Sequence, residues 1–247
     1  MSEALHLPII DLSSPDRLSI ANSIRQACVE HGFFYLVNHG VEEELLKKVF
    51  EQCSKFFSLP IAEKMKFSRK NHRGYTALYA EKLDTSSSAK GDSKESFYIG
   101  PLADHLNQWP LEGDLESSGE DIYGASAHSD YGMITLLVTD GVPGLQVCRE
   151  KSKQPQIWED VPSMSGAFIV NIGDMMERWT NCLFRSTLHR VLPPGQERYS
   201  VGFFINPNKD CLVECLESCC SESSPPRFPP IRSLDYLEER VRLTYGS

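Results

Sequence analysis

The stretch AHSDYGMITLL, residues 127–137, decides how this chain is interpreted, because it places His128 two residues ahead of Asp130. Side chains two apart on an extended strand point to the same side of a sheet. A second histidine, His189, follows 61 positions after the first (189 − 128), and we expect another strand to bring it to the same place. Two imidazoles and one carboxylate on one face suit Fe(II) and leave coordination positions open. The sequence therefore predicts a metal site formed by His128, Asp130 and His189.

An arginine and a serine follow the second histidine. Arg198 lies nine residues after His189 (198 − 189), and Ser200 lies two residues further on, so the two side chains share one face of a strand. A guanidinium forms bidentate pairs with carboxylates. We predict that Arg198 and Ser200 hold the far carboxylate of a dicarboxylic acid bound at the metal. The alternative is an exposed salt bridge of little energetic value, but the apolar run at residues 201–205 favours burial.

These motifs, in this order, resemble those of the 2-oxoglutarate- and Fe(II)-dependent dioxygenases, in the isopenicillin-N-synthase-like branch that is common in plants. The resemblance extends over most of the chain, from about residue 7 to residue 207. A bare His-x-Asp pair is weak evidence, whereas the full ordered set is specific. The segments that carry the resemblance are 8–12, 32–40, 127–137, 171–174, 186–191 and 198–200.

The resemblance implies an enzyme with Fe(II), 2-oxoglutarate as co-substrate, and O2. It would couple the oxidative decarboxylation of 2-oxoglutarate to hydroxylation or desaturation of a small organic molecule. Tyr131, Leu136 and Phe203 are candidates for lining the substrate pocket. The alternative for these three is ordinary core packing, which is the commoner role of such side chains on strands.

One segment departs from the family pattern. Family members are longer between the Asn-x-Trp-Pro turn, here residues 107–110, and the first metal motif. Residues 111–120 are too short and acidic to replace that segment, so we predict a shortened form with an exposed sheet edge. An alternative is therefore a non-catalytic or weakly active isoform that retains the iron site but lacks part of the co-substrate pocket. Two further alternatives are an iron enzyme that does not use 2-oxoglutarate and a zinc-binding cupin.

Short apolar stretches between Gly and Pro turns predict a mainly β fold with a helical N-terminal cover. We expect a double-stranded β-helix, a jelly-roll or cupin-like barrel, incomplete where the segment is missing. Residues 1–120 would form the α/β cover, shortened at its end, and residues 121–247 the jelly-roll core with a C-terminal helix. The predicted core strands are 122–128, 134–139, 145–149, 157–161, 167–171, 186–191 and 199–206, and the strands predicted upstream are 7–12, 33–37 and 95–100. The predicted helices are 14–31, 41–57, 60–66, a short turn at 173–178, and 233–243. Residues 73–75 are predicted as a loop.

The bulk composition limits the partners. The formal net charge is −9 with no cluster of basic residues, which disfavours nucleic-acid binding. No apolar run reaches the length of a membrane span, and the N-terminus shows no secretion signal. We therefore expect a cytoplasmic monomer that binds a small molecule, with no nucleic acid and no membrane.

The eight cysteines are expected to be reduced thiols in such a compartment. Four of them lie near the C-terminus, at Cys211, Cys215, Cys219 and Cys220. Their CxxxC spacing, without a nearby histidine, is a poor match to zinc sites. We interpret them as ordinary thiols rather than as a metal or disulfide site.

Overall fold

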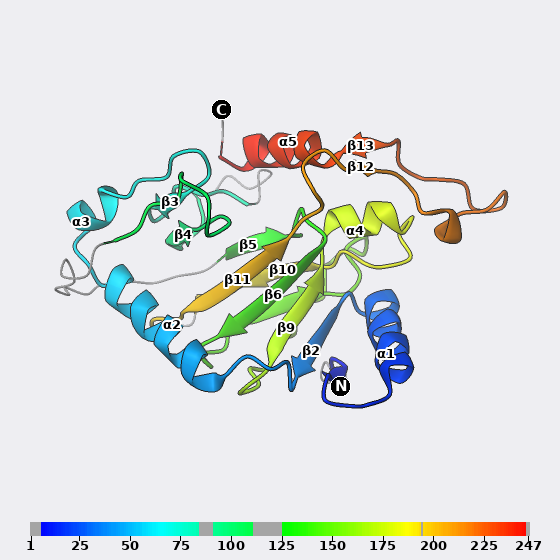
Figure 1. Ribbon diagram of the computed structural model, residues 1–247, viewed down its shortest axis with the longest axis horizontal. Helices are drawn as coiled ribbons and strands as arrows, with labels where there is room; N and C mark the ends of the chain where they lie inside the picture. Colours follow the sequence, from blue (N-terminus) through cyan, green and yellow to red (C-terminus); the bar gives the residue numbers. More distant parts are fainter. Residues whose placement is uncertain (1–5, 84–90, 111–124, 194, 246–247) are drawn as a thin grey trace.

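The computed structural model describes residues 6–83, 91–110, 125–193 and 195–245. Its centre consists of two sheets, one behind the other in Figure 1. The larger contains, in spatial order, β1 (Ile9–Asp11), β2 (Phe33–Val37), β9 (Phe168–Ile172), β6 (Ile134–Thr139) and β11 (Ser200–Ile205). The smaller contains β5 (Ala125–His128), β10 (Leu188–Val191), β7 (Leu145–Cys148) and β8 (Glu159–Asp160). All pairs except β1 with β2 are antiparallel, so the predicted double-sheet core of short strands is confirmed.

Apolar side chains from both sheets fill the space between them. Alternate residues of a strand face the same side, so Phe33 and Tyr35 of β2 point inward together with Ile169 of β9. They meet Leu145 and Val147 of β7 in one buried cluster. Each such side chain contributes about 1.5–3 kcal/mol by leaving water, and this cluster holds the two sheets together below the site.

The opposite face of the larger sheet is covered by α1 (Arg17–Glu30). Phe34 of β2 and Val170 of β9 point to this outer side and pack against Ala27 of the helix. The helix and the interior core therefore use alternate residues of the same strands.

The start of α1 differs from the prediction by a few residues. The predicted helix begins at residue 14, whereas α1 begins at Arg17, and the Asp16 side chain is its cap, accepting from Ser19 N at 3.0 Å. The predicted end is confirmed: Gly32 has a left-handed φ of +68°, and its N–H donates to Ala27 O at 2.9 Å.

The rest of the N-terminal half forms a lobe beside the sheets. It contains α2 (Glu43–Phe57), α3 (Ile61–Met65) and a small antiparallel pair, β3 (Gly74–Thr76) with β4 (Ser96–Tyr98). The loop predicted at residues 73–75 is wrong, because Tyr75 packs in a buried cluster with Phe56 and Leu59 and the segment becomes a strand. A buried ion pair, Lys64 Nζ to Glu95 Oε1 at 2.8 Å, ties α3 to the segment before β4.

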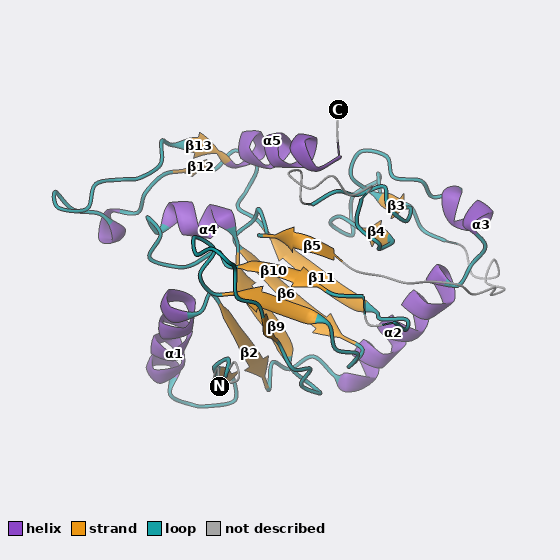
Figure 2. Cartoon of the chain, turned by 180° about the vertical axis from the view of Figure 1, so that it is seen from behind, coloured by secondary structure: helices purple, strands orange, loops and turns teal. Residues whose placement is uncertain are grey.

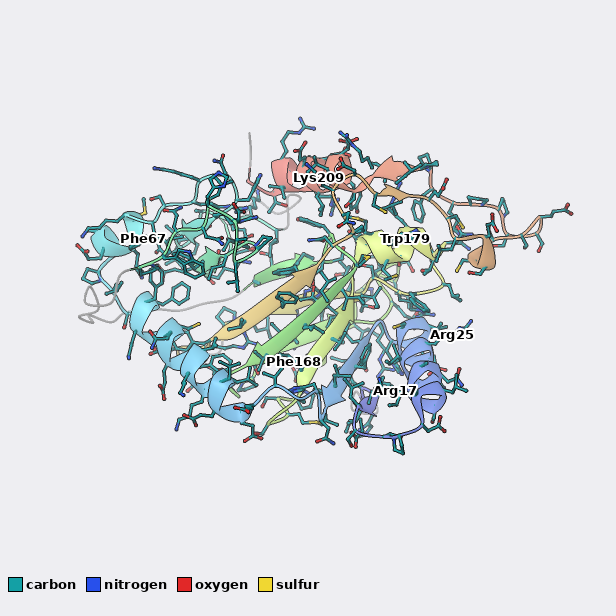
Figure 3. All side chains as sticks on the ribbon, in the orientation of Figure 1. Arg17, Arg25, Phe67, Phe168, Trp179 and Lys209 are labelled. Atoms are coloured by element: carbon teal, nitrogen blue, oxygen red, sulfur yellow. The ribbon has the colours of Figure 1, made fainter. Side chains whose placement is uncertain are left out.

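The C-terminal part carries α4 (Asp174–Trp179), an arm with β12 (Leu212–Val213), a short 3-10 helix (Glu217–Cys219) and β13 (Ile231–Arg232), and α5 (Ser233–Tyr245). Figure 2 shows the helices around the two central sheets, with the short pairs β3–β4 and β12–β13 also lying outside those sheets. Trp179, labelled in Figure 3, lies where α4 meets the arm, and its carbonyl accepts from Leu216 N at 2.9 Å. All eight cysteines, including the four of the arm, are free.

Two features qualify the predicted organisation. Strands β1 and β2 extend the larger sheet of the core, so the regions predicted as 1–120 and 121–247 share one sheet. At the other end of that sheet β11 pairs only with β6 among the described strands, and Phe203 and Phe204 are 65% and 53% exposed. The open edge agrees with the predicted shortening, although residues 111–120, where the missing segment is predicted, lie outside the described residues. None of the described helices has the length and apolar character needed to cross a membrane.

Candidate metal centre

The two histidines are brought together by pairing of β5 with β10. His128 at the end of β5 lies directly opposite His189 of β10 in the register, and their ring centroids are 4.3 Å apart. Asp130 follows β5 and turns back, so that its Oδ1 lies 3.8 Å from His128 Nε2 and 3.7 Å from His189 Nε2. Within the described part of the chain, these three residues are the group of His, Cys, Asp and Glu side chains whose ligand atoms all lie within 4.8 Å of one another.

The carboxylate of Asp130 has one oxygen held by donors and one that faces the histidines. Its Oδ2 accepts from Thr135 Oγ1 and from Asn171 Nδ2, the latter at 2.8 Å. Thr135 and Asn171 lie opposite each other on β6 and β9, both on the inner face of the larger sheet. The remaining oxygen, Oδ1, is the one that faces the two Nε2 atoms. Sequence reasoning missed both donors. The signals that could have revealed them are Asn171 as the one polar residue of β9 and Thr135 among the apolar residues 134–138 of β6.

The turn that carries Asp130 is fixed by the start of α4. Asp174 N donates to Asp130 O at 2.7 Å, and Met175 N donates to Gly132 O at 3.0 Å. A Cβ at Gly173 would lie only 2.3 Å from Gly132 O, so this close approach of the two backbones requires glycine. The helix start therefore satisfies the carbonyls of the turn and sets the position of Asp130.

Each histidine is oriented through its second nitrogen. His128 Nδ1 lies 2.7 Å from Ser126 O, and His189 Nδ1 lies 3.3 Å from Thr187 O. A carbonyl can only accept, so Nδ1 carries the proton and Nε2 keeps its lone pair for a ligand. Phe33 meets the His189 ring edge-on, with 5.5 Å between centroids, and restricts its rotation. This is the arrangement by which proteins orient metal-binding imidazoles.

The protonation states match metal binding. Burial, with the neighbouring His189, lowers the pKa of His128 to about 3, against the opposing effect of Asp130. Burial by itself would raise the pKa of Asp130, but the two facing histidines and the donors Thr135 and Asn171 hold that pKa below its ordinary value. At neutral pH the His128 imidazole is therefore neutral and the carboxylate is ionised, which are the forms that bind metals.

Arg198 lies just before β11, and its Nε donates to Val142 O at 3.1 Å. Burial lowers the pKa of its guanidinium, opposed by Asp140, yet an arginine stays charged at neutral pH. Within the described residues no carboxylate lies within 4.0 Å of its nitrogens. Ser200 pairs with Thr139 and is exposed. A half-buried cation and a hydroxyl two residues apart thus remain available for an anionic ligand.

The register separates the predicted pocket residues by face. Thr135 faces Asp130, so its neighbour Leu136 points to the outer side and packs on the α1 cluster. Phe203 is opposite Leu136 and shares that outer face, whereas Phe204 is opposite Thr135 and faces the metal side. A one-residue step changes the face of every side chain in a strand, so the structure does not bring Leu136 and Phe203 to the site and brings Phe204 there instead.

Tyr131, the third predicted pocket residue, points toward the C-terminal helix. Its hydroxyl is hydrogen-bonded to Thr244 Oγ1, and the Arg240 guanidinium lies 4.6 Å from its ring centroid. Tyr131 therefore fastens α5 against the turn that carries Asp130, a role that its position beside a ligand does not reveal in the sequence.

Comparison with known proteins agrees with this geometry. Residues 7–112 match the family model for the N-terminal region of non-haem dioxygenases in morphine synthesis, and residues 106–207 match the 2OG-Fe(II) oxygenase superfamily. The chain is 36% identical to kihadalactone A synthase LFS of Citrus sinensis, over 96% of this chain and 92% of that protein. This chain belongs to the 2-oxoglutarate- and Fe(II)-dependent oxygenases. It is an oxidoreductase that uses Fe(II) as cofactor and 2-oxoglutarate and O2 as co-substrates, and nothing in the comparisons favours the non-catalytic alternative.

This oxygenase is also similar to a second plant enzyme in sequence and to two proteins of known structure. It is 35% identical to azadirone synthase LFS of Melia azedarach, over 95% of this chain and 92% of that protein. It resembles a full-length Neurospora crassa protein solved in complex with alpha-KG and thymine, with a TM-score of 0.81 and 27% identity over 98% of each chain. It also resembles JOX2 in complex with 2OG, Fe and JA, with a TM-score of 0.76 and 28% identity over 98% of this chain and 86% of that one.

The alignment with the Citrus sinensis protein also bears on chain length. It runs over 308 positions, whereas 96% of this 247-residue chain is about 237 residues, which leaves about 71 positions without a counterpart here (308 − 237). The oxygenase is therefore shorter than this relative within the aligned region, in agreement with the predicted shortening.

Proposed function

We propose that His128 Nε2, His189 Nε2 and Asp130 Oδ1 bind the Fe(II) of this oxygenase. The observation that carries the proposal is the orientation of the three groups. Asp130 Oδ2 accepts hydrogen bonds from Thr135 and Asn171, while Oδ1 faces the Nε2 atoms of both histidines at 3.7–3.8 Å. Two imidazole nitrogens and one carboxylate oxygen are the donor set that suits non-haem Fe(II). When bound, the metal supplies activation of O2 and its coupling to 2-oxoglutarate.

The remaining residues of the site bind and orient the co-substrate. Arg198 and Ser200 would hold the distal carboxylate of 2-oxoglutarate, because a bidentate guanidinium and a hydroxyl match its oxygens. Arg198 is itself positioned through its Nε bond to Val142 O, which leaves the Nη atoms for the ligand. Phe204, on the inner face of β11, supplies an apolar wall next to Thr135. In this arrangement the protein fixes the distance between metal and far carboxylate, and so aligns the dicarboxylic acid.

The substrate is, on this proposal, a small organic molecule that is hydroxylated or desaturated. Support comes from the solved relatives, whose complexes contain thymine or JA. We further propose that the oxygenase works as a monomer in the cytoplasm, without nucleic acid or membrane. The net charge of −9 and the free state of all eight cysteines support that part.

The proposal is tested by anaerobic loading of the purified chain with Fe(II), followed by titration with 2-oxoglutarate. We expect a metal-to-ligand absorption band that saturates, and formation of succinate once O2 is admitted. His189→Ala should lose the band, whereas His105→Ala, at an exposed histidine outside the site, should behave as the wild type.

The role of the arginine is tested in the same titration. Arg198 is half-buried, so its loss is compared with that of a hydrogen bond to a charged group, about 1.5–3 kcal/mol, which is roughly tenfold or more in affinity. Arg198→Ala should therefore weaken 2-oxoglutarate binding by at least that factor, and Arg185→Ala, at an exposed arginine, should not. If Arg198→Ala binds 2-oxoglutarate as tightly as the wild type, Arg198 does not hold the distal carboxylate. A chain that takes up only zinc would refute the iron site.

A further inference from the structure

The strand that carries His128 has an irregularity just before the ligand. In the pairing of β5 with β10, His189 is opposite His128 and Val191 is opposite Ala125. Two steps along β10 therefore correspond to three steps along β5, so Ser126 and Ala127 form a bulge. A bulge leaves backbone groups of the extra residue without partners in the ladder. Strand β5 is also the edge of its sheet among the described strands, so no neighbouring strand compensates.

A buried carboxylate from the N-terminal lobe takes the place of the missing partner. Asp92 is 2% exposed, and its Oδ1 accepts from both Ser126 N, at 3.1 Å, and Ser126 Oγ. Ser126 O in turn lies 2.7 Å from His128 Nδ1. One short chain of hydrogen bonds thus runs from Asp92 through Ser126 to the imidazole. A carboxylate bonded to two donors on one residue fixes both the position and the tilt of that residue.

Asp92 is itself held by backbone groups on the other side. Asp92 N donates to Glu81 O at 2.7 Å, and Leu83 N donates to Asp92 Oδ2 at 3.3 Å. The adjoining Gly91 has a φ of +147°, and a Cβ there would lie 2.2 Å from Tyr79 O, so the close approach of these segments requires glycine. The carboxylate is therefore attached to a fixed part of the lobe rather than to a free loop.

We propose that Asp92 is a positioning residue for the metal centre, which acts through Ser126 to set the orientation of the His128 ring. The inference rests on the proposed function, because it concerns a ligand of the same iron. It assigns the N-terminal half of the chain a part in metal binding beyond covering the core. Groups that orient metal ligands through hydrogen bonds typically change metal affinity by about 10- to 100-fold when removed.

The test compares Asp92→Asn and Ser126→Ala with Asp104→Asn. The control carboxylate, Asp104, lies in the same half and also bonds a backbone N–H, Leu106 N at 3.0 Å, and a side chain, Arg73 Nε at 3.2 Å, but no residue of the site. For each variant, Fe(II) affinity is measured anaerobically, the visible spectrum is recorded with Co(II) in place of iron, and the melting temperature is measured without metal.

We expect Asp92→Asn to lose about tenfold or more in Fe(II) affinity and to change the Co(II) spectrum. Ser126→Ala, which removes only the hydroxyl, should lose less, and Ser126→Thr should restore the wild-type spectrum. The double variant Asp92→Asn/Ser126→Ala should lose less than the two single losses combined, since both act on one interaction. Asp104→Asn should lower the melting temperature without altering either metal measurement.

The outcomes separate this inference from the proposed function. A wild-type chain that takes up neither Fe(II) nor Co(II) would overturn both. A wild-type chain that binds both metals, with unchanged affinity and spectrum in Asp92→Asn and Ser126→Ala, would overturn the role of Asp92 alone. Because Ser126→Ala is a small change, it supplies an answer even where Asp92→Asn does not fold.

Discussion

Asn171 offers a sharp test of how the carboxylate ligand is held. Its side chain is 2% exposed and its Nδ2 donates to Asp130 Oδ2 at 2.8 Å. A hydrogen bond to a charged group is worth about 1.5–3 kcal/mol, and about 1.36 kcal/mol corresponds to a factor of ten. If that bond serves to aim Oδ1 at the metal, Asn171→Ala should weaken Fe(II) binding by about 10- to 100-fold, which agrees with the effect of other outer groups around metals.

The assay is an anaerobic Fe(II) titration together with thermal unfolding of the metal-free chain. Asn181→Ala is the matched control: Asn181 is 6% exposed and its amide holds Cys219 O and Pro225 O in the arm, away from the ligands. Its φ of +54° is unfavourable for alanine, so this variant should lose at least as much stability as Asn171→Ala. The reasoning is refuted if Asn171→Ala binds Fe(II) as tightly as the wild type, or if both variants lose metal affinity equally.

Three other outcomes follow from the site and the sheet edge. Fe(II) at about 100 times its dissociation constant should stabilise the chain by about 2.7 kcal/mol, seen as a higher melting temperature that His189→Ala abolishes. Phe203→Lys, on the outer face of the open β11, should raise the temperature at which light scattering reports aggregation, with no change in 2-oxoglutarate affinity; an earlier onset would contradict the edge as the aggregation site. Tyr131→Phe should cost about 1 kcal/mol in urea unfolding by losing its bond to Thr244, and a large loss of Fe(II) affinity would place Tyr131 in the site after all.

Much of the ligand set is readable in the sequence because strand geometry is local. The His-x-Asp spacing keeps the two ligands close along the chain, although β5 ends at His128 and Asp130 reaches the site through the turn that follows. The flanking apolar stretches predict the strands that the structure contains. Arg198 and Ser200 are likewise only two residues apart. The helices are also readable, because their apolar spacing and their capping residues are signals within one or two helical turns of sequence. The start of α1 differs by a few residues because Ser14 and Asp16 are both good caps and only one is used.

The tertiary structure decided which residues meet. The register of β6 against β9 puts Thr135 and Asn171 on the same carboxylate oxygen, and the register of β11 against β6 turns Phe204 inward and Phe203 outward. The bulge in β5, where Ser126 N donates to Asp92 instead of to a neighbouring strand, also depends on the distant partner strand β10. The sequence of one strand determines neither its register nor a bulge, because both depend on how two distant segments and the core between them fit together. The chain alone therefore determines the kinds of ligand, and packing between its distant parts determines how each ligand is aimed.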